Sequence, residues 1–138
     1  MSNMATWVDT GFLVALFARN DTHHEAAKAF LQENTAMDLH SIWPVIVEAN
    51  FFLNNEGKQA LLQWIERGAL IMHEITTQEL PLIRQVIAQY KNIDPDFTDA
   101  VLVTLADLCK IRRILTVDVR DFSIYRFTDG SSFERLWI

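Results

Sequence analysis

Two kinds of segment alternate along this chain, as shown by the spacing of its apolar residues. Short continuous apolar runs rich in β-branched and aromatic residues predict buried strands, and apolar residues recurring every three or four positions predict helices. Strands are expected at residues 5–9, 39–42, 69–73, 114–117 and 133–136. Helices are expected at residues 10–17, 23–32, 44–54, 58–67, 77–90 and 98–109, with a turn or short helix at 121–124.

The order of these segments predicts the fold class. Strands that alternate with helices and are apolar throughout are typical of a parallel sheet with helices on both faces. We therefore expect an α/β fold in three layers, α/β/α, around a central and mainly parallel sheet. The chain has 138 residues, half of them apolar. That length suits one domain better than two, so residues 1–138 are expected to form a single domain.

Four acidic residues stand in otherwise apolar surroundings. Asp9 and Asp118 each follow a predicted strand, whereas Glu48 and Asp99 lie near the start of apolar helices. Ligand sites in such sheets lie beyond the carboxyl ends of the strands, so we expect these carboxylates to meet there. Anions buried together repel one another and lose their hydration, and a divalent cation resolves that conflict. The pattern predicts an oxygen-ligand site for Mg²⁺ or Mn²⁺.

Other polar residues near this predicted site have more ordinary roles. Thr10 and Thr116 flank the acids and are expected to orient them through hydroxyl hydrogen bonds. Thr10 is equally suited to cap a helix, and Thr116 to a strand. Asp21 and Asp96 are suited to N-capping. The remaining acids on helix faces opposite the apolar stripes are expected to be solvated: Glu25, Glu33, Glu56, Glu66, Glu79 and Asp107.

The histidines and the single cysteine do not predict a site. His23 and His24 are adjacent on a helix and point in different directions. His40 and His73 have no Cys or His partner at a zinc-finger spacing, so zinc is not expected. Cys109, the only cysteine, is expected to be a small buried apolar residue late in a helix. One cysteine excludes an intramolecular disulfide and suits a reducing cytosol.

The charge and the apolar content of the chain limit its partners. The net charge is −6, which argues against a general electrostatic sink for nucleic acid, although bound cations would offset it at the predicted site. The apolar stretches are far shorter than a bilayer span, and the N-terminal residues lack the basic start of a signal peptide. We therefore expect a cytoplasmic protein that does not enter a membrane.

Large apolar side chains are more numerous than one small core is expected to hide. Some of them should form an exposed patch and an interface, so we expect a homodimer or a bound partner helix. For Phe51 and Phe52 a place in the core is equally compatible with the pattern. The residues in question are Trp43, Phe51, Phe52, Trp64, Trp137 and Ile138.

The ordered motifs of the chain resemble those of the PIN-domain family, specifically the VapC-like ribonuclease toxins. The resemblance spans nearly the whole chain, and although each motif is short, their order and spacing together are fairly specific. The matching stretches are Val8-Asp9-Thr10-Gly11-Phe12-Leu13-Val14-Ala15-Leu16-Phe17, Val47-Glu48-Ala49, Asp96-Phe97-Thr98-Asp99-Ala100 and Leu115-Thr116-Val117-Asp118-Val119-Arg120-Asp121-Phe122.

The resemblance implies a PIN-like sandwich of helices around a parallel sheet, and Mg²⁺- or Mn²⁺-dependent cleavage of RNA by a metal-activated water. It also implies an antitoxin partner. The family's acidic quartet falls on Asp9, Glu48, Asp99 and Asp118, and Asp96 matches a position that is often acidic and could serve as an auxiliary ligand.

Two further residues lie within the last matching motif. Asp121 belongs to the same stretch, but turn-capping is the role expected of it. Arg120 follows the ligand position Asp118 by two residues and is expected to contact a substrate phosphate.

Two other functions are alternatives to a ribonuclease. A PIN-like module that binds RNA or protein without cleaving remains an alternative, although an intact acidic quartet is not expected in a site that has lost its catalytic activity. A phosphatase or phosphotransferase of the haloacid-dehalogenase type would need a second Asp two residues after the nucleophile. Thr10 and Gly11 follow Asp9 instead, which argues against that chemistry.

Overall fold

A parallel sheet forms the centre of the computed structural model, which describes residues 4–137. Within these residues the sheet has five strands in the order β3-β2-β1-β4-β5, and every neighbouring pair is parallel. Their bounds are Ala5–Val8 for β1, Asp38–Ile42 for β2, Ile71–His73 for β3, Arg113–Leu115 for β4 and Glu134–Leu136 for β5.

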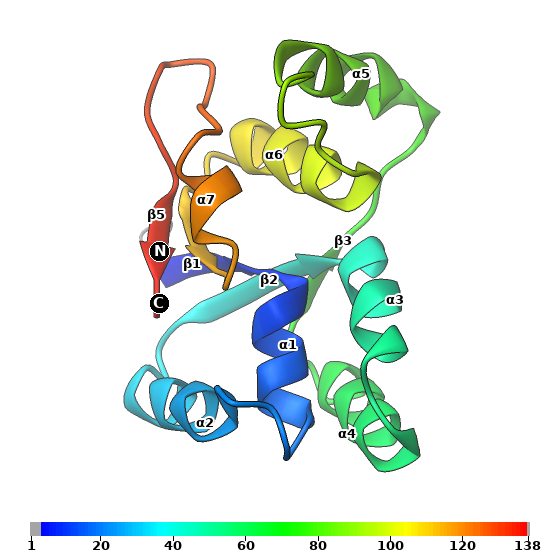
Figure 1. Ribbon diagram of the computed structural model, residues 1–138, viewed down its shortest axis with the longest axis vertical. Helices are drawn as coiled ribbons and strands as arrows, with labels where there is room; N and C mark the ends of the chain where they lie inside the picture. Colours follow the sequence, from blue (N-terminus) through cyan, green and yellow to red (C-terminus); the bar gives the residue numbers. More distant parts are fainter. Residues whose placement is uncertain (1–3, 138) are drawn as a thin grey trace.

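Helices cover both faces of this sheet. Figure 1 shows α1, α2 and α4 on one side and α5 and α6 on the other, which confirms the predicted three-layer α/β/α fold. The helices are α1 (Thr10–Phe17), α2 (His24–Glu33), α3 (Trp43–Phe51), α4 (Asn55–Glu66), α5 (Leu80–Gln89), α6 (Phe97–Cys109) and α7 (Val119–Phe122), and the 3₁₀ turn η2 (Thr77–Glu79) precedes α5. No helix in the described part of the chain is both long and apolar enough to cross a membrane.

The first strand lies in the middle of the sheet. Trp7 and Val8 are completely buried, and β1 pairs with β2 on one side and β4 on the other. The chain proceeds outward from β1 through β2 to β3, and later returns to the other side of β1 through β4 and β5. The strand order therefore reverses between β1 and β4, and such a reversal opens a crevice at the carboxyl ends of the strands.

Acidic side chains cap three helices that begin near this crevice. Asp9, not Thr10 as we predicted, caps α1, and its Oδ1 accepts a hydrogen bond from Thr10 N at 2.8 Å. Asp96 caps α6 by accepting from Asp99 N, as expected. Asp118 caps the short helix α7 by accepting from Asp121 N. Because each cap lies just before its helix, the same residues that end the strands and loops also begin the helices.

The start of α1 approaches the segment after β4 very closely. A Cβ added at Gly11 would overlap a methyl group of Val117. Glycine at this position therefore lets the residue after Asp9-Thr10 pack against the residue before Asp118. This contact holds the two strand ends of the crevice together.

Two further details of the sequence-based prediction were wrong. Helix α4 begins at Asn55 rather than residue 58, because the Asn54 side chain caps it by accepting from Gly57 N at 2.8 Å. Gly57 thus lies in the first turn instead of breaking the helix. Cys109 is exposed rather than buried, because it is the last residue of α6 and the apolar stripe of that helix ends before it.

The large apolar residues divide between the core and the surface. Trp64 and Trp137 pack against the core, whereas Phe51 is 79% and Phe52 69% exposed. Trp43 and Val47 are also exposed, and they share one side of α3 with Phe51 through their four-residue spacing. Ile138 lies outside the described residues. An apolar surface patch is therefore present, as expected.

Candidate functional site

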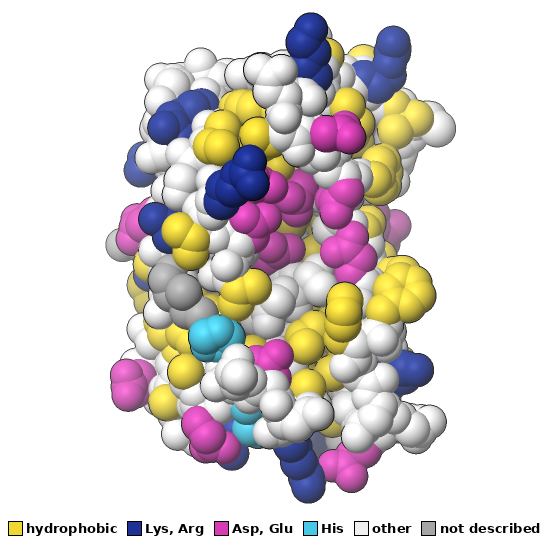
Figure 2. All heavy atoms as spheres, in the orientation of Figure 1, with side chains coloured by type: hydrophobic (Ala, Val, Ile, Leu, Met, Phe, Trp, Pro, Cys, Tyr) yellow, Lys and Arg dark blue, Asp and Glu magenta, His cyan; other side chains and the backbone are white. Residues whose placement is uncertain are grey.

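Three carboxylates meet beyond the end of β4. Asp99 comes from the first turn of α6, Asp118 from the loop after β4, and Asp121 from α7. One carboxylate oxygen from each lies within 4.8 Å of the other two. Figure 2 shows Asp and Glu side chains gathered near the centre of one face of the molecule, with Lys or Arg side chains close by. Two of the four predicted ligands, Asp99 and Asp118, are therefore neighbours.

Asp9 lies deeper than the other acids and is only 7% exposed. Its Oδ1 accepts from Thr10 N, and its Oδ2 accepts from Thr116 Oγ1 at 2.9 Å. The pKa of Asp9 is raised to about 6, mainly by burial and also by the charges of Asp118 and Glu48, against the lowering effect of these hydrogen bonds. Asp9 is thus electrostatically coupled to both neighbouring acids.

Glu48 is held by two threonines from other helices. Thr10 Oγ1 donates to its Oε1 at 3.0 Å, and Thr98 Oγ1 donates to its Oε2 at 2.6 Å. Thr10 therefore bridges two acids, because its amide holds Asp9 and its hydroxyl holds Glu48. Glu48 is placed at the side of the site formed by the starts of α1 and α6.

Asp99 is the acid whose ionisation is most strongly opposed. Its pKa is raised to about 8, mainly by burial and also by the carboxylates of Asp9, Asp96 and Asp118. Tyr125, completely buried, donates its hydroxyl to Asp99 Oδ2 at 3.4 Å. Ionisation of Asp99 is therefore disfavoured near neutral pH unless a cation compensates its charge.

The acids of this site suit a hard divalent cation. All the donors are carboxylate oxygens, the ligand type that Mg²⁺ and Mn²⁺ prefer. The raised pKa values of Asp9 and Asp99 arise from burial and from mutual repulsion. A bound cation would remove both penalties, because it compensates the charges where water is excluded. The residues present therefore fit such an ion.

The threonines expected to orient the acids do contact them, and Thr116 has a second bond as well. Its Oγ1 donates to Asp9 and also accepts from Asp118 N at 2.9 Å, so it ties the two strand-end acids together. Asp96 lies one helical turn before Asp99 as an exposed N-cap and raises the pKa of Asp99. Arg120 is exposed on α7, between Asp118 and Asp121.

Sequence reasoning missed three residues of this site. Asp121 was assigned to turn-capping, yet its carboxylate belongs to the cluster of three. Its spacing of three residues from Asp118 on a helical turn is the signal that could have revealed this. Thr98 and Tyr125, which hold Glu48 and Asp99, carried no comparable signal, because only the tertiary fold brings them to those acids.

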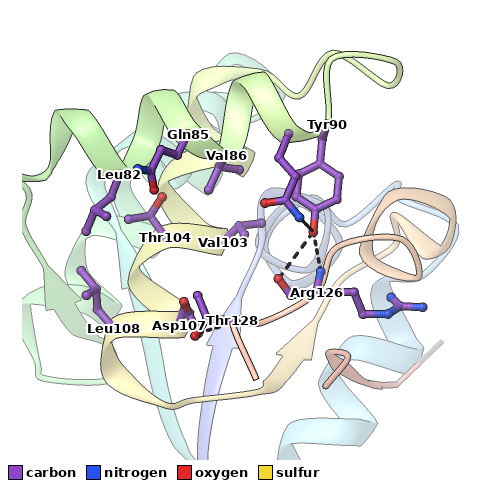
Figure 3. Close-up of a pocket in the computed structure, with 11 residues that line it drawn as sticks. Leu82, Gln85, Val86, Tyr90, Val103, Thr104, Asp107, Leu108, Arg126 and Thr128 are labelled. Carbon is purple, nitrogen blue, oxygen red and sulfur yellow. Dashed lines mark hydrogen bonds between the residues drawn. The ribbon is translucent and has the colours of Figure 1, made fainter. Parts of the chain in front are cut away.

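A separate cavity of about 260 Å³ lies between α5, α6 and the segment after α7. Its walls include Leu82, Val86 and Leu108, and its polar groups include Asp107, which accepts from Thr128 N and Oγ1 (Figure 3). Tyr90 lines it and packs edge-on against Tyr125, with ring centroids 5.0 Å apart. Tyr90 therefore connects the wall of the cavity to Tyr125, and none of the carboxylates of the site lines the cavity.

Comparison with known proteins agrees with this geometry. The chain is 26% identical to the ribonuclease VapC26 of Mycobacterium tuberculosis over 131 residues, which cover 91% of this chain and 96% of that protein. Its fold is similar to the crystal structure of VapC20 of Mycobacterium tuberculosis, a toxin that cleaves the sarcin–ricin loop, with a TM-score of 0.66 and 19% identity. That match covers 79% of this chain and 86% of VapC20. The model of the PIN domain matches residues 7–127, and the chain therefore belongs to the PIN domain family.

Proposed function

We propose that this protein is a metal-dependent endoribonuclease that hydrolyses phosphodiester bonds of RNA. The observation that carries the proposal is the meeting of Asp99, Asp118 and Asp121 beyond the end of β4. Asp9 interacts electrostatically with Asp99 and Asp118 of this cluster, and Glu48 interacts with Asp9. Membership of the PIN domain family and the similarity to a named ribonuclease support the same activity. A module that only binds RNA would not need this set of mutually repelling acids.

Asp9, Glu48, Asp99 and Asp118 are the proposed ligands of Mg²⁺ or Mn²⁺, with Asp96 as an auxiliary. Such an ion, when bound, supplies Lewis acidity for the attack of water on a phosphodiester. The polar neighbours hold these acids in position. Thr116 orients Asp9, Thr10 and Thr98 orient Glu48, and Tyr125 orients Asp99. Fixed carboxylates lose little conformational freedom when they bind an ion, which favours a defined geometry.

Arg120 is the residue proposed to bind the substrate. It is exposed on α7, one residue from Asp121 and two from Asp118. A guanidinium at that position would pair with a phosphate of RNA beside the carboxylates and offset the negative net charge locally. The acids would then face the scissile bond while Arg120 holds the backbone.

The partners proposed are RNA, an antitoxin protein and a second copy of this chain. VapC20 is described as a toxin, and the resemblance to that group implies that this chain acts as the toxin of a toxin–antitoxin pair. The exposed stripe of Trp43, Val47 and Phe51 on α3 supports a homodimer, because contiguous exposed apolar side chains mark interfaces.

Cleavage of RNA by the purified protein tests the proposed function. We expect cleavage in Mg²⁺ or Mn²⁺, none in excess EDTA, and none with Asp9→Asn or Asp99→Asn. Glu25→Gln is the control, because Glu25 is exposed on α2, and it should cleave like the unaltered protein. If Asp9→Asn cleaves normally, or cleavage persists in EDTA, the proposal is wrong. Binding of RNA without cleavage by the unaltered protein in Mn²⁺ would favour the non-catalytic module instead.

A further inference from the structure

Three side chains with metal-binding atoms contact one another in a row, with His73 in the middle, at a second place in the fold. His40 Nδ1 of β2 lies 2.7 Å from His73 Nε2 at the end of β3. The other ring nitrogen of His73, Nδ1, lies 4.0 Å from Cys109 Sγ at the end of α6. Cys109 follows Asp99 by ten residues, about 15 Å along the helix axis. The group is therefore separate from the carboxylate site at the other end of α6.

Trp7 fixes all three elements that contribute to this group. Its ring packs against His73 at a centroid distance of 4.8 Å and against His40 at 5.8 Å. Its Nε1 donates to Ile111 O at 3.2 Å, two residues beyond Cys109. Trp7 is completely buried in the central strand, so it serves as a rigid support. The two imidazoles and the end of α6 are held in place before any ligand binds.

The distances fit coordination by His73 and Cys109. Zinc binds sulfur at about 2.3 Å and imidazole nitrogen at about 2.0–2.1 Å, so the two ligand atoms of a tetrahedral site lie roughly 3.6 Å apart. The observed separation of Sγ and Nδ1 is 4.0 Å, which a small side-chain rotation closes. Cys109 is exposed, so its side chain has room for that rotation and water can reach the remaining coordination positions.

His40 contacts the ring nitrogen of His73 that does not face Cys109. A metal-binding histidine usually donates its other ring N–H to a hydrogen-bond acceptor, which fixes its tautomer. Here His73 Nε2–H can donate to His40 Nδ1 at 2.7 Å, and that tautomer leaves His73 Nδ1 with its lone pair toward Cys109. Burial lowers the pKa of both histidines, and the proximity of His73 lowers that of His40 further. Both shifts favour the neutral imidazole, the form that coordination requires.

We propose that His73 and Cys109 bind a thiophilic divalent cation such as Zn²⁺, with His40 orienting His73. A thiolate and an imidazole select Zn²⁺ or Co²⁺ over Mg²⁺, whereas the carboxylate site selects Mg²⁺ or Mn²⁺. The two sites therefore take different ions. Binding releases the thiol proton of Cys109 to solvent as the metal–sulfur bond forms.

Titration of the full-length, reduced protein with Co²⁺ tests this site directly. A thiolate bound to Co²⁺ produces a charge-transfer band in the near ultraviolet, which carboxylate ligands cannot produce. We expect the band to saturate near one equivalent of Co²⁺ and to disappear when Zn²⁺ is added. Cys109→Ser should abolish it, and this variant should fold because Cys109 is exposed. His73→Gln should weaken Co²⁺ binding at least as strongly as His40→Ala does, because it removes a ligand and not only the residue that orients one.

His40→Ala and a carboxylate variant separate orientation from coordination. His40→Ala should keep the band and weaken binding of Co²⁺ about 10- to 100-fold, the usual effect of losing the hydrogen-bond partner of a ligand. Asp118→Asn should leave the band and its affinity unchanged, because Asp118 belongs to the other site. A protein without the band at Co²⁺ concentrations well above its own would overturn the proposal. So would a band of unchanged affinity in His73→Gln, since Cys109 would then bind the ion without His73.

Discussion

Thr98 donates its hydroxyl to Glu48 Oε2 at 2.6 Å, and this short bond joins the start of α6 to α3. Thr98 is buried, so the bond is shielded from competing water and is strengthened by the charge of the acceptor. The other carboxylate oxygen of Glu48 accepts from Thr10. Glu48 therefore has its plane fixed by two helices other than its own.

Replacing Thr98 with valine should impair the site without unfolding the protein. The change keeps the shape of the side chain and removes the donor to Glu48, so we expect RNA cleavage to fall about 10- to 100-fold. Thr104→Val is a matched control, since Thr104 is equally buried on the same helix and donates only to Ala100 O. Single-turnover cleavage rates and thermal melts of both variants measure the effect. Equal loss of activity in both variants would contradict a specific role for Thr98.

Mn²⁺ should stabilise the folded protein through the carboxylate site. A ligand that binds only the native state stabilises it by about 2.7 kcal/mol at 100 times its Kd, and here it also relieves repulsion among the acids. Thermal melts with and without millimolar Mn²⁺ measure the shift. Asp9→Asn should remove most of that shift, whereas Glu25→Gln should retain it. An unchanged melting temperature in the unaltered protein would count against a metal site.

The metal-free protein should become less stable as the pH rises from about 4 to 8. Folding raises the pKa of Asp9 from 3.8 to about 6 and that of Asp99 from 3.8 to about 8. Between those values the folded state binds more protons than the unfolded chain, so the free energy of unfolding falls with rising pH. For Asp9 alone the loss is on the order of 3 kcal/mol.

Urea denaturation in EDTA at pH 5, 6.5 and 8 measures that trend. Asp99→Asn should flatten the part between pH 6.5 and pH 8, because the group responsible for it is gone, and it should be more stable than the unaltered protein at pH 8. The exposed control Glu25→Gln should keep the original slope. Stability that rises with pH across this window would show that the acids are not buried together.

Loss of Arg120 should weaken RNA binding and lower its dependence on salt. Each phosphate contact of a basic side chain contributes about 0.7 to the slope of log K against log salt for single strands. We expect Arg120→Ala to reduce that slope by about 0.7, the contribution of one phosphate contact, and to leave the fold unchanged. Arg84→Ala on α5, also exposed, serves as the control. Identical slopes for the two variants would exclude Arg120 as the phosphate contact.

Replacing Phe51 with serine should weaken self-association. Phe51 is 79% exposed, so its removal leaves the core intact, and an exposed aromatic side chain at the centre of an interface is worth 2 kcal/mol or more, a roughly 30-fold change in Kd. Sedimentation across a range of micromolar concentrations measures the shift toward monomer. Leu62→Ser, at an exposed position of α4, should not change it. A strictly monomeric unaltered protein would rule out the dimer.

Much of the fold follows from local pattern. The continuous apolar run at Trp7-Val8 is typical of a buried strand, and the apolar spacings after it are typical of helices. The alternation of these elements predicts a parallel sheet between two layers of helices. The meeting of Asp99 and Asp118 was also predictable, because strand ends and helix starts come together at one edge of such a sheet.

Helix boundaries depended on side chains that local periodicity does not report. Asn54 begins α4 early through its bond to Gly57 N, and Asp9 rather than Thr10 caps α1. In both cases the helix begins where a side-chain oxygen accepts a hydrogen bond from a backbone N–H in the first turn. Cys109 is exposed because its helix ends there, so the end point of the helix decides its exposure and the apolar character of the side chain does not.

The sequence by itself determined the layers of the fold and the acidic residues around which the site is built. Only the tertiary structure decided which residues surround those acids, since Thr98 and Tyr125 reach Glu48 and Asp99 across elements far apart in the chain. The same is true of His40 and His73, which have no metal-site spacing in the sequence and yet lie 2.7 Å apart. Their contact arises because β2 and β3 are neighbouring parallel strands, and parallel pairing brings together side chains that no short-range pattern connects.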